Sequence, residues 1–453
     1  MSSYIPPRNL PDWHRRDLSV LWHPCTQMAE HPDTLPLLPI HSGRGVWLQD
    51  IDGKRYLDAI SSWWTNLFGH AEPRIAQAIA EQALTLEHVI FAGFSHSPGL
   101  QLAERLTALA PKGLSRVFYA DNGSAAVEIA LKMSFHSFVN QGIQGRTRFM
   151  ALNNGYHGET LGALSMADIP LYRQVYAPLL LEPIFAPSPD YLNKQPGESP
   201  ADCALRCAGE LRRLVDRHRH ELCALIVEPL VQCAGGMRMY HPLYLTEARR
   251  ICDEYGIHLI ADEIAVGFGR TGSFFACEQD GISPDFLCLS KGLTGGFLPM
   301  SAVLTTETVF ARFLSGDRSR GFLHSHSYTG NPLGCAAALA SLDIFESDDV
   351  INRNRGRAAA MADASLRMAK NPNIRQIRQT GMIVAFELGR DAETPFPPEQ
   401  RRGLAAYRAG LGHGAVLRPL GDTLYWMPPY CITPDELEFL FNATLRAVEE
   451  ACR

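Results

Sequence analysis

Short apolar runs alternate with segments of helical periodicity through the middle of the chain, over roughly 250 residues. The apolar runs are RVFYA (116–120), RFMAL (148–152), ALIVEP (224–229), HLIADE (258–263) and FLCLS (286–290). Helical spacing is clear in RIAQAIAEQA (74–83) and LQLAERLTALA (100–110). Buried strands that alternate with helices in this way predict an α/β fold with a mostly parallel sheet.

The two ends of the chain differ from this middle part. The stretch GVWLQDIDGKRYLDAI (45–60) has the form of a hairpin whose turn is Asp52-Gly53. The stretch NPLGCAAALASLDIFE (331–346) predicts a long helix that leaves the α/β part, and a closing helix is expected after Thr433. We therefore expect a large domain over residues 71–335 and a smaller α+β domain made of residues 1–70 and 336–453.

Composition excludes several classes of protein. A net charge of −6 gives no reason to expect nucleic acid or an anionic membrane surface as a partner. No apolar run reaches the ~18 residues that a membrane span needs. The first residues, MSSYIPPRNLPDWHRRD, carry prolines and charges where a signal peptide needs an apolar segment. Eleven cysteines occur without a C-x-x-C pair, which predicts reduced thiols and a cytoplasmic location.

One glycine pattern offers a first functional interpretation. The stretch LIADEIAVGFGRTG (259–272) contains G-x-G-x-x-G at Gly267, Gly269 and Gly272, which is the fingerprint of an NAD(P)-dependent oxidoreductase when it joins a strand to a helix. Here an acidic pair stands between the strand and the glycines, and SFFACEQDGISPD follows without helical periodicity. The pattern therefore favours a turn-rich loop, and the oxidoreductase is kept as a distant alternative.

Two charged residues end neighbouring apolar runs. Asp262 closes HLIAD and Lys291 follows FLCLS, a separation that allows one loop and one strand between them. If the two strands are adjacent and parallel, both side chains lie at the carboxyl edge of the sheet, where α/β proteins bind ligands. The alternatives are a capping or ion-paired aspartate and a solvated lysine.

Two further segments belong to the same predicted edge. Asn122-Gly123-Ser124 stands between a strand and a helix, so the backbone N–H groups and the Ser124 hydroxyl make an anion seat suited to phosphate. An ordinary helix N-cap is the alternative. Tyr156 and His157 lie in a glycine-flanked turn, NNGYHGET, after the next strand; a surface aromatic is the alternative there.

These pieces together fit pyridoxal 5′-phosphate. Its phosphate needs the helix N-terminus, its ring a stacking partner, its pyridine nitrogen a carboxylate and its aldehyde a lysine. A positively charged pyridinium would also explain a buried, ionised Asp262. No single member of the set is specific, but the ordered combination is.

At this point the sequence resembles the class III pyridoxal-phosphate aminotransferases of fold type I, over nearly the whole chain. Within the class it is most similar to the branch that acts on 8-amino-7-oxononanoate in biotin biosynthesis. SSWW and GGMRMYHP favour this branch, as does Ala265, where most class III members have Gln. The supporting stretches are LWHPCTQM, SSWW, ADNGSAAVEIALKM, NGYHGET, VEPLVQCAGGMRMYHP, ADEIAVGFGRTGSFFACE, LSKGLTGG, YTGNPLGCAAA and LRPLGDTLYWMPPY.

The resemblance implies a role for each matching residue of the cofactor site. Lys291 forms the Schiff base and shuttles the proton, and Asp262 pairs with the pyridine nitrogen. Gly123 and Ser124 hold the phosphate. Tyr156 covers the ring and lines the substrate site.

The resemblance also implies how substrate is bound. Trp63 and Trp64 wall the pocket for the aliphatic chain, although plain core is the alternative for both. Arg418 pairs with a substrate carboxylate, a task suited to its bidentate fork. Ser327 stands where the family has a Thr that reaches the phosphate of the neighbouring subunit, so a homodimer with shared active sites is expected.

The implied reaction uses S-adenosylmethionine as amino donor and gives 7,8-diaminononanoate, but two departures leave the donor open. Cys25 stands where the family has Tyr, and residues 324–327 read HSHS where well-described members have HGPT. The second change resembles relatives that use lysine as donor. Lysine as donor and another class III omega-aminotransferase activity are the alternatives.

The two remaining features are an acidic residue and a histidine pair. Glu228, in IVEPL, is expected beside the site, behind the residues that touch the cofactor. His324 and His326 form an H-x-H, for which phosphate-loop residues are favoured over a metal site because no third ligand is evident.

Overall fold

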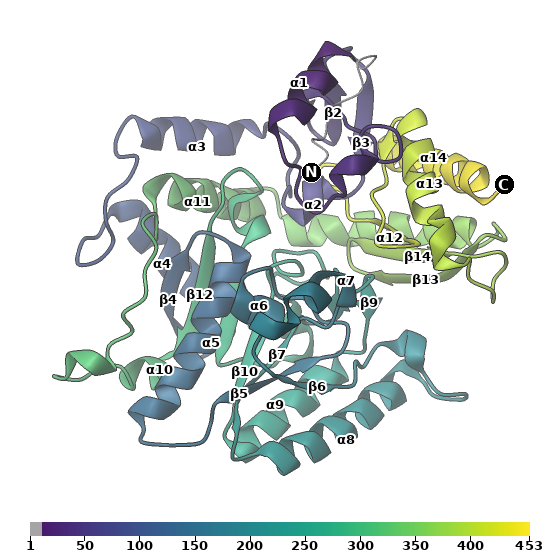
Figure 1. The fold of residues 1–453 in the computed structure, drawn as a ribbon. Helices are drawn as coiled ribbons and strands as arrows, with labels where there is room; N and C mark the ends of the chain where they lie inside the picture. The colour runs from purple at the N-terminus through teal and green to yellow at the C-terminus, as the bar shows by residue number, and fades with distance from the viewer. Residues whose placement is uncertain (1–10) are drawn as a thin grey trace, which may run out of the picture.

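A seven-stranded sheet forms the centre of the protein, in a computed structural model that describes residues 11–453 (Figure 1). The first ten residues of the expected 1–70 segment lie outside the described residues. Only β12 runs against the other six strands, so the expected mostly parallel sheet is confirmed. The strand order is β4 (Leu114–Ala120), β12 (Ser301–Thr306), β11 (Phe286–Leu289), β10 (His258–Asp262), β7 (Leu222–Val227), β5 (Arg148–Leu152) and β6 (Ile184–Ala186).

Helices cover both faces of this sheet. Alternate side chains of each strand point to opposite faces, so the sheet belongs to two apolar clusters. On β10, Ile260 packs in the cluster of helix α5 (Gly123–Asn140), while Leu259 and Ala261 pack in the cluster of α8 (Pro200–His218) and α9 (Leu243–Tyr255). The α/β layering expected from the alternating pattern is therefore present.

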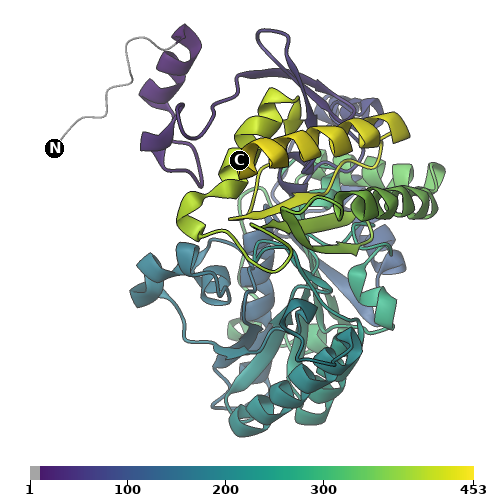
Figure 2. The same cartoon turned by 90° about the vertical axis from the view of Figure 1, so that its right-hand side faces the viewer.

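Segments from both ends of the chain build the other part of the molecule. Strand β15 (Ala415–Val416) adds to the sheet of β1 (Ile40–Arg44), β2 (Trp47–Asp50) and β3 (Arg55–Asp58), with Leu57 paired to Ala415. The hairpin turn expected between β2 and β3 is present, with Gly53 at φ 84°. Figure 2 shows α13 (Arg402–Gly412) and α14 (Pro434–Cys452) in the same half of the molecule as these strands.

The remaining elements connect or flank these two parts. A second small sheet contains β13 (Ile374–Thr380), β14 (Ile383–Leu388) and β16 (Thr423–Trp426), and β8 (Val231–Gln232) pairs with β9 (Arg238–Met239). The other helices are α1 (Asp12–Val20), α2 (Ser61–Trp64), α3 (Pro73–Ala83), α4 (Ser97–Leu109), α6 (Leu161–Ser165), α7 (Pro170–Arg173), α10 (Glu307–Ala311), α11 (Pro332–Ser347) and α12 (Val350–Met368). None of the helices within residues 11–453 is long and apolar enough to cross a membrane.

The glycines at positions 267, 269 and 272 belong to a loop, and at least one of them is needed for close packing. No α-helix opens after Gly272, and the next element is a short 3-10 helix, Ala276–Asp280. Gly269 has φ 87°, and a Cβ on it would lie 2.9 Å from Ile351 Cδ1 in α12. The loop therefore needs glycine to pack against the other part of the molecule, and the dinucleotide fingerprint lacks its helix.

Arg270, within the same loop, ties the large sheet to both ends of the chain. Its guanidinium is 1% exposed and donates to Pro428 O at 2.8 Å and to Asn66 O at 3.0 Å. It also lies 4.8 Å from the centroid of the Tyr430 ring. Three segments far apart in the sequence thus meet on one buried cation.

We expect Arg270→Met to lower the free energy of unfolding by about 3 kcal/mol or more, because two buried carbonyls lose charged donors. The measurement is the urea midpoint of the variant against the unchanged protein. Arg213→Ala is the control, since Arg213 pairs with Glu210 on the exposed surface, where an ion pair contributes little. Equal midpoints for the two variants would contradict the assignment.

Candidate active site

A cavity of about 490 Å³ opens at the carboxyl edge of the large sheet and brings together the residues expected there. Asp262, Lys291, Gly123, Ser124 and Tyr156 all line its wall. We call it the inner cavity. Its size is typical of a site for a small molecule or cofactor.

Asp262 and Lys291 meet because their strands are neighbours. Strands β10 and β11 pair in parallel, with Asp262 opposite Cys288. Lys291 stands three residues after Cys288 and is the first residue of a 3-10 turn, with φ 44°. Desolvation by burial lowers the pKa of the Lys291 amine below the ordinary lysine value, and the Asp262 carboxylate opposes that shift.

The sequence placed His157 at the predicted edge but gave no role for it. Its buried ring lies against Asp262, with Nδ1 2.7 Å from Oδ2. The other carboxylate oxygen, Oδ1, accepts the Ile264 N–H at 3.2 Å. Asp262, 4% exposed, therefore has partners within the protein before any ligand is considered. The signal was its position beside Tyr156 in the glycine-flanked turn, but that position gives no direction for the ring.

The N-terminus of α5 faces the same cavity. Asn122 caps the helix, its Oδ1 accepting the Ala125 N–H at 3.0 Å, so the N-cap that the sequence offered as an alternative is present. The N–H groups of the first helical residues have no partner within the helix. A Cβ on Gly123 would lie 2.9 Å from Ile264 Cγ2, so glycine lets the helix start approach the end of β10. The Ser124 hydroxyl lies 2.7 Å from Thr160 Oγ1.

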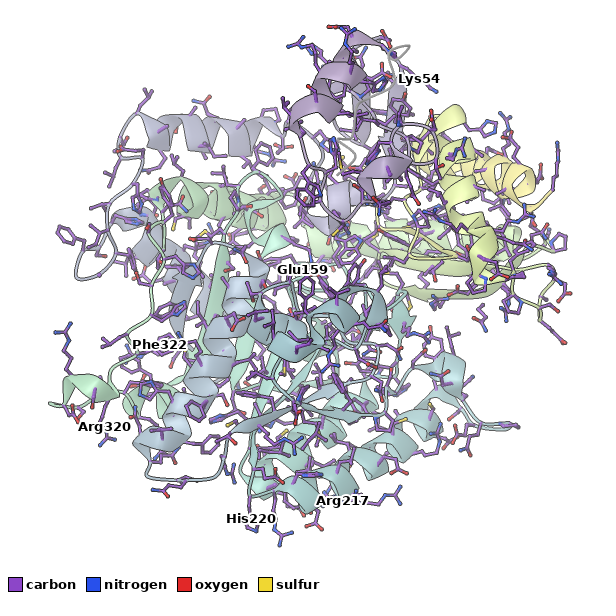
Figure 3. All side chains as sticks on the ribbon, viewed as in Figure 1. Lys54, Glu159, Arg217, His220, Arg320 and Phe322 are labelled. Carbon is purple, nitrogen blue, oxygen red and sulfur yellow. The ribbon has the colours of Figure 1, made fainter. Side chains whose placement is uncertain are left out.

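Glu228 also lines the inner cavity and contacts the backbone of Tyr156. Its two oxygens accept the Tyr156 N–H and the Cys233 N–H, both at 3.0 Å. Burial raises the pKa of Glu228 to about 7. The Tyr156 hydroxyl donates to Glu159 at 2.8 Å, and Glu159 lies where the two parts of the molecule meet (Figure 3). Glu228 thus fixes the backbone of the aromatic residue rather than its ring.

A second cavity, of about 830 Å³, adjoins the first. We call it the outer cavity; Trp63, Arg418, Cys25, Tyr172 and Tyr425 line it. The Arg418 guanidinium lies 4.9 Å from the centroid of a Trp63 ring. Aromatic walls with a cation among them suit an apolar chain that ends in a carboxylate.

The adjacent tryptophans are separated between the two cavities. Trp64 is 4% exposed and lines the inner cavity, where its ring centroid lies 4.8 Å from Lys291 Nζ. Trp63 is 37% exposed and lines the outer cavity. Trp64 therefore belongs both to the buried core and to the wall of the inner cavity, whereas Trp63 lies outside the core.

Ser327 does not join either cavity of its own chain. It lies exposed in the segment between α10 and α11. Of its neighbours, His326 pairs with Asp121 at 3.1 Å, and His324 Nδ1 lies 2.9 Å from Lys132 Nζ. Within residues 11–453 no group of three His, Cys, Asp or Glu side chains is arranged to hold a metal ion.

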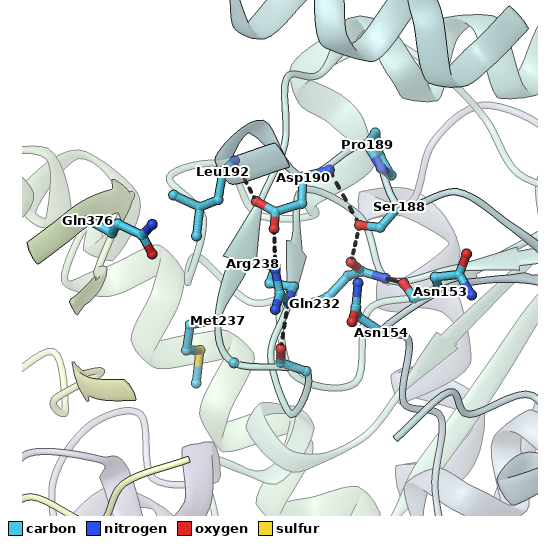
Figure 4. Close-up of polar contacts among 12 residues, drawn as sticks. Asn153, Asn154, Ser188, Pro189, Asp190, Leu192, Gln232, Met237, Arg238 and Gln376 are labelled. Carbon is cyan, nitrogen blue, oxygen red and sulfur yellow. Dashed lines mark hydrogen bonds and ion pairs between the residues drawn. The ribbon is translucent and has the colours of Figure 1, made fainter. Parts of the chain in front are cut away.

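The GGMRMYHP stretch belongs to a network of polar contacts with the segments that follow β5 and β6 (Figure 4). Arg238 donates to Asp190 at 2.6 Å and to Gly235 O at 3.0 Å. Ser188 donates to Gln232 at 2.6 Å, and Gln232 donates to Asn153 O at 2.8 Å. The β8–β9 hairpin is thereby fixed to the segment that leads from β5 to Tyr156.

The pattern of the family described as aminotransferase class-III matches residues 28–448. The chain belongs to the class III aminotransferases. A curated class III relative from Helicobacter pylori, named adenosylmethionine-8-amino-7-oxononanoate aminotransferase, is 46% identical over 441 residues, covering 96% of this chain and 97% of that protein. A protein of the same name from Nitratidesulfovibrio vulgaris is 45% identical, covering 95% of this chain and 80% of that protein.

Solved class III structures share the fold. The adenosylmethionine-8-amino-7-oxononanoate aminotransferase of Methanocaldococcus jannaschii superimposes with a TM-score of 0.91 at 36% identity, covering 97% of this chain and 98% of that one. An omega transaminase from Pseudomonas jessenii, in complex with PMP, gives 0.92 at 28% identity, covering 97% and 98%. The protein is thus an aminotransferase of fold type I whose cofactor is pyridoxal 5′-phosphate.

We expect Lys291 in the cofactor-free protein to titrate below the ordinary lysine range, because its ammonium form is desolvated. Reductive ¹³C-methylation followed by NMR titration measures this directly. The Lys291→Ala protein identifies the signal by its loss. A Lys291 signal that titrates at or above the ordinary range would show that the amine is solvated.

Proposed function

We propose that this aminotransferase converts 8-amino-7-oxononanoate to 7,8-diaminononanoate in biotin biosynthesis, with S-adenosylmethionine as amino donor. The names of the relatives from Helicobacter pylori and Nitratidesulfovibrio vulgaris support this substrate pair. The observation that carries the proposal is the desolvated Lys291 amine in an inner cavity, next to an outer cavity that holds Arg418. This arrangement suits a ketone on a chain that ends in a carboxylate.

Four groups of the inner cavity hold the cofactor in this proposal. The N–H groups of Gly123 and Ser124 take the phosphate at the start of α5. Asp262 faces the pyridine nitrogen, and the Tyr156 ring covers the cofactor. When bound, pyridoxal 5′-phosphate supplies an aldehyde for amines and a ring that withdraws electrons from the substrate carbon.

The catalytic work of the chain falls to Lys291. Its lowered pKa favours the neutral amine, which attaches the cofactor and moves the proton at the substrate carbon. Asp262 keeps the pyridine nitrogen protonated, and His157 fixes the orientation of that carboxylate through the 2.7 Å contact. Glu228 holds the Tyr156 backbone in place.

The outer cavity receives the rest of either substrate. Arg418 pairs with the carboxylate, while Trp63 and Trp64 bound the aliphatic chain. Aromatic walls also suit a sulfonium cation, and the names of the relatives favour S-adenosylmethionine over lysine. We further propose that the chain divides into a large domain of residues 71–335 and a smaller domain of residues 1–70 with 336–453. A cytoplasmic location remains a prediction.

A homodimer with shared sites is the second part of the proposal. Ser327 is exposed and does not line its own inner cavity, which agrees with a residue that serves the partner's phosphate. Large apolar side chains are exposed in this segment and in the loop between α3 and α4, which a second copy would cover. They are Leu84, Ile90, Phe94, Leu314, Leu323 and Tyr328.

We expect Asp262→Asn to fold normally and to lose kcat by roughly 10²-fold or more, equivalent to about 3 kcal/mol, because an amide does not keep the pyridine nitrogen protonated. Steady-state kinetics with 8-amino-7-oxononanoate measure the loss. Circular dichroism of the variant controls for the fold. An unchanged kcat would make Asp262 structural.

We expect S-adenosylmethionine to change the absorbance of the bound cofactor in the donor half-reaction, at lower concentration than lysine does. Each donor is added alone to the loaded enzyme, without acceptor. A response to lysine at lower concentration than to S-adenosylmethionine would overturn the donor assignment and leave the aminotransferase assignment intact.

We expect the loaded protein to sediment as a dimer at micromolar concentration in analytical ultracentrifugation. Leu323→Asp adds a charge to the surface proposed for the partner and should weaken both the dimer and the activity. Leu205→Asp, on exposed α8, is the matched control and should change neither. A fully active monomer contradicts shared sites.

A further inference from the structure

The Ser61–Trp64 turn has an unusual backbone. Its four residues have φ angles of 51°, 47°, 69° and 72°, all in the left-handed region, and none is glycine. The Trp64 N–H donates to Ile60 O at 2.9 Å and the Thr65 N–H donates to Ser61 O at 3.0 Å, so the turn closes on itself. Left-handed non-glycine residues normally occur singly. A run of four persists only where the surroundings hold it.

Asp58 is the group that holds this turn from below. It is 1% exposed, and its Oδ1 accepts the Ile60 N–H at 3.2 Å. Its Oδ2 accepts the Ser62 hydroxyl at 2.8 Å and faces His70 Nε2 at 3.0 Å. His70 Nδ1 lies 3.1 Å from the Asn66 amide nitrogen, which donates, so the ring proton is on Nε2 and points at Asp58.

The C-terminal segment holds the turn from the other side. The Ser61 hydroxyl donates to Met427 O at 2.7 Å, and Trp64 Nε1 donates to the Tyr425 hydroxyl at 3.0 Å. The Met427 N–H in turn donates to Ala59 O at 2.7 Å. The turn is thus fixed between β3 and β16, the two strand ends that border it.

The left-handed turn is what sends the two indoles into different cavities. Trp63 points to the outer cavity beneath Arg418, and Trp64 points to the inner cavity beside Lys291. A relaxed backbone at these residues would redirect both rings. Asp58 and His70 themselves line neither cavity.

We propose that Asp58, Ser62 and His70 are positioning residues for the transamination, because they impose the left-handed turn that places Trp63 and Trp64. This rests on the function proposed above. Through the turn, these three residues determine how well the outer cavity binds the chain and carboxylate of a substrate. They do not take part in the chemistry at Lys291.

The expected kinetic signature is a change in KM more than in kcat. Asp58→Asn weakens the hydrogen bonds to Ser62 and His70. The KM for 8-amino-7-oxononanoate should therefore rise roughly 10-fold, while kcat changes much less. Asp50→Asn is the matched control in the same hairpin. Asp50 also holds a hydroxyl and backbone N–H groups, from Tyr56, Asp52 and Lys54, but lines neither cavity. It should leave KM unchanged.

Two variants of Ser62 test the backbone itself. Ser62→Ala and Ser62→Gly both remove the hydroxyl, but only glycine adopts φ 47° without steric cost. The glycine variant should therefore melt higher than the alanine variant, and its KM should lie closer to that of the unchanged enzyme. At an ordinary backbone position the stability order is the reverse.

The outcomes separate this inference from the proposed function. Absence of turnover of 8-amino-7-oxononanoate by the unchanged loaded enzyme overturns the proposed function, while the stability order of the Ser62 pair still tests the turn without any substrate. With an active unchanged enzyme, the inference is overturned by an unaltered KM in Asp58→Asn or by an equal rise in Asp50→Asn. A glycine variant less stable than the alanine variant also overturns it.

Discussion

The parallel pairing of β10 with β11 is the constraint on which the site depends. Its register sets Asp262 opposite Cys288, so the next turn of the chain delivers Lys291 to the same edge. A shift of one residue would turn Asp262 to the opposite face of the sheet. Successive residues of β10 pack in two different clusters, Ile260 in that of α5 and Leu259 in that of α8 and α9, so a slip would exchange their surroundings.

Burial then gives these groups their chemistry. The amine of Lys291 is desolvated, which lowers its pKa, and the same environment raises the pKa of Glu228 to about 7. Asp262 is kept in this environment by the His157 ring and the Ile264 N–H. The inner cavity is thus prepared for a cationic ring before one is bound. In the proposed function, the outer cavity with Trp63 and Arg418 recognises the substrate.

The sequence predicted most of the large sheet and the position of Asp262 and Lys291 at one edge of it, because apolar runs and strand-end charges are local signals. It did not predict β12, the one antiparallel strand, since strand direction depends on the path of the chain between strands. The contact of His157 with Asp262 was also missed, because it joins two turns from distant parts of the chain. The left-handed turn before Trp64 has no sequence signal at all, since no glycine marks it.

The central claim is that Lys291 is the amine to which the cofactor attaches, and borohydride reduction of the loaded enzyme tests it most directly. Reduction converts the bond between cofactor and lysine into a stable secondary amine, which peptide mass spectrometry locates. The account predicts the modification on the peptide that contains Lys291 and none in the Lys291→Ala protein. Stoichiometric modification at another lysine, such as Lys132, would contradict it.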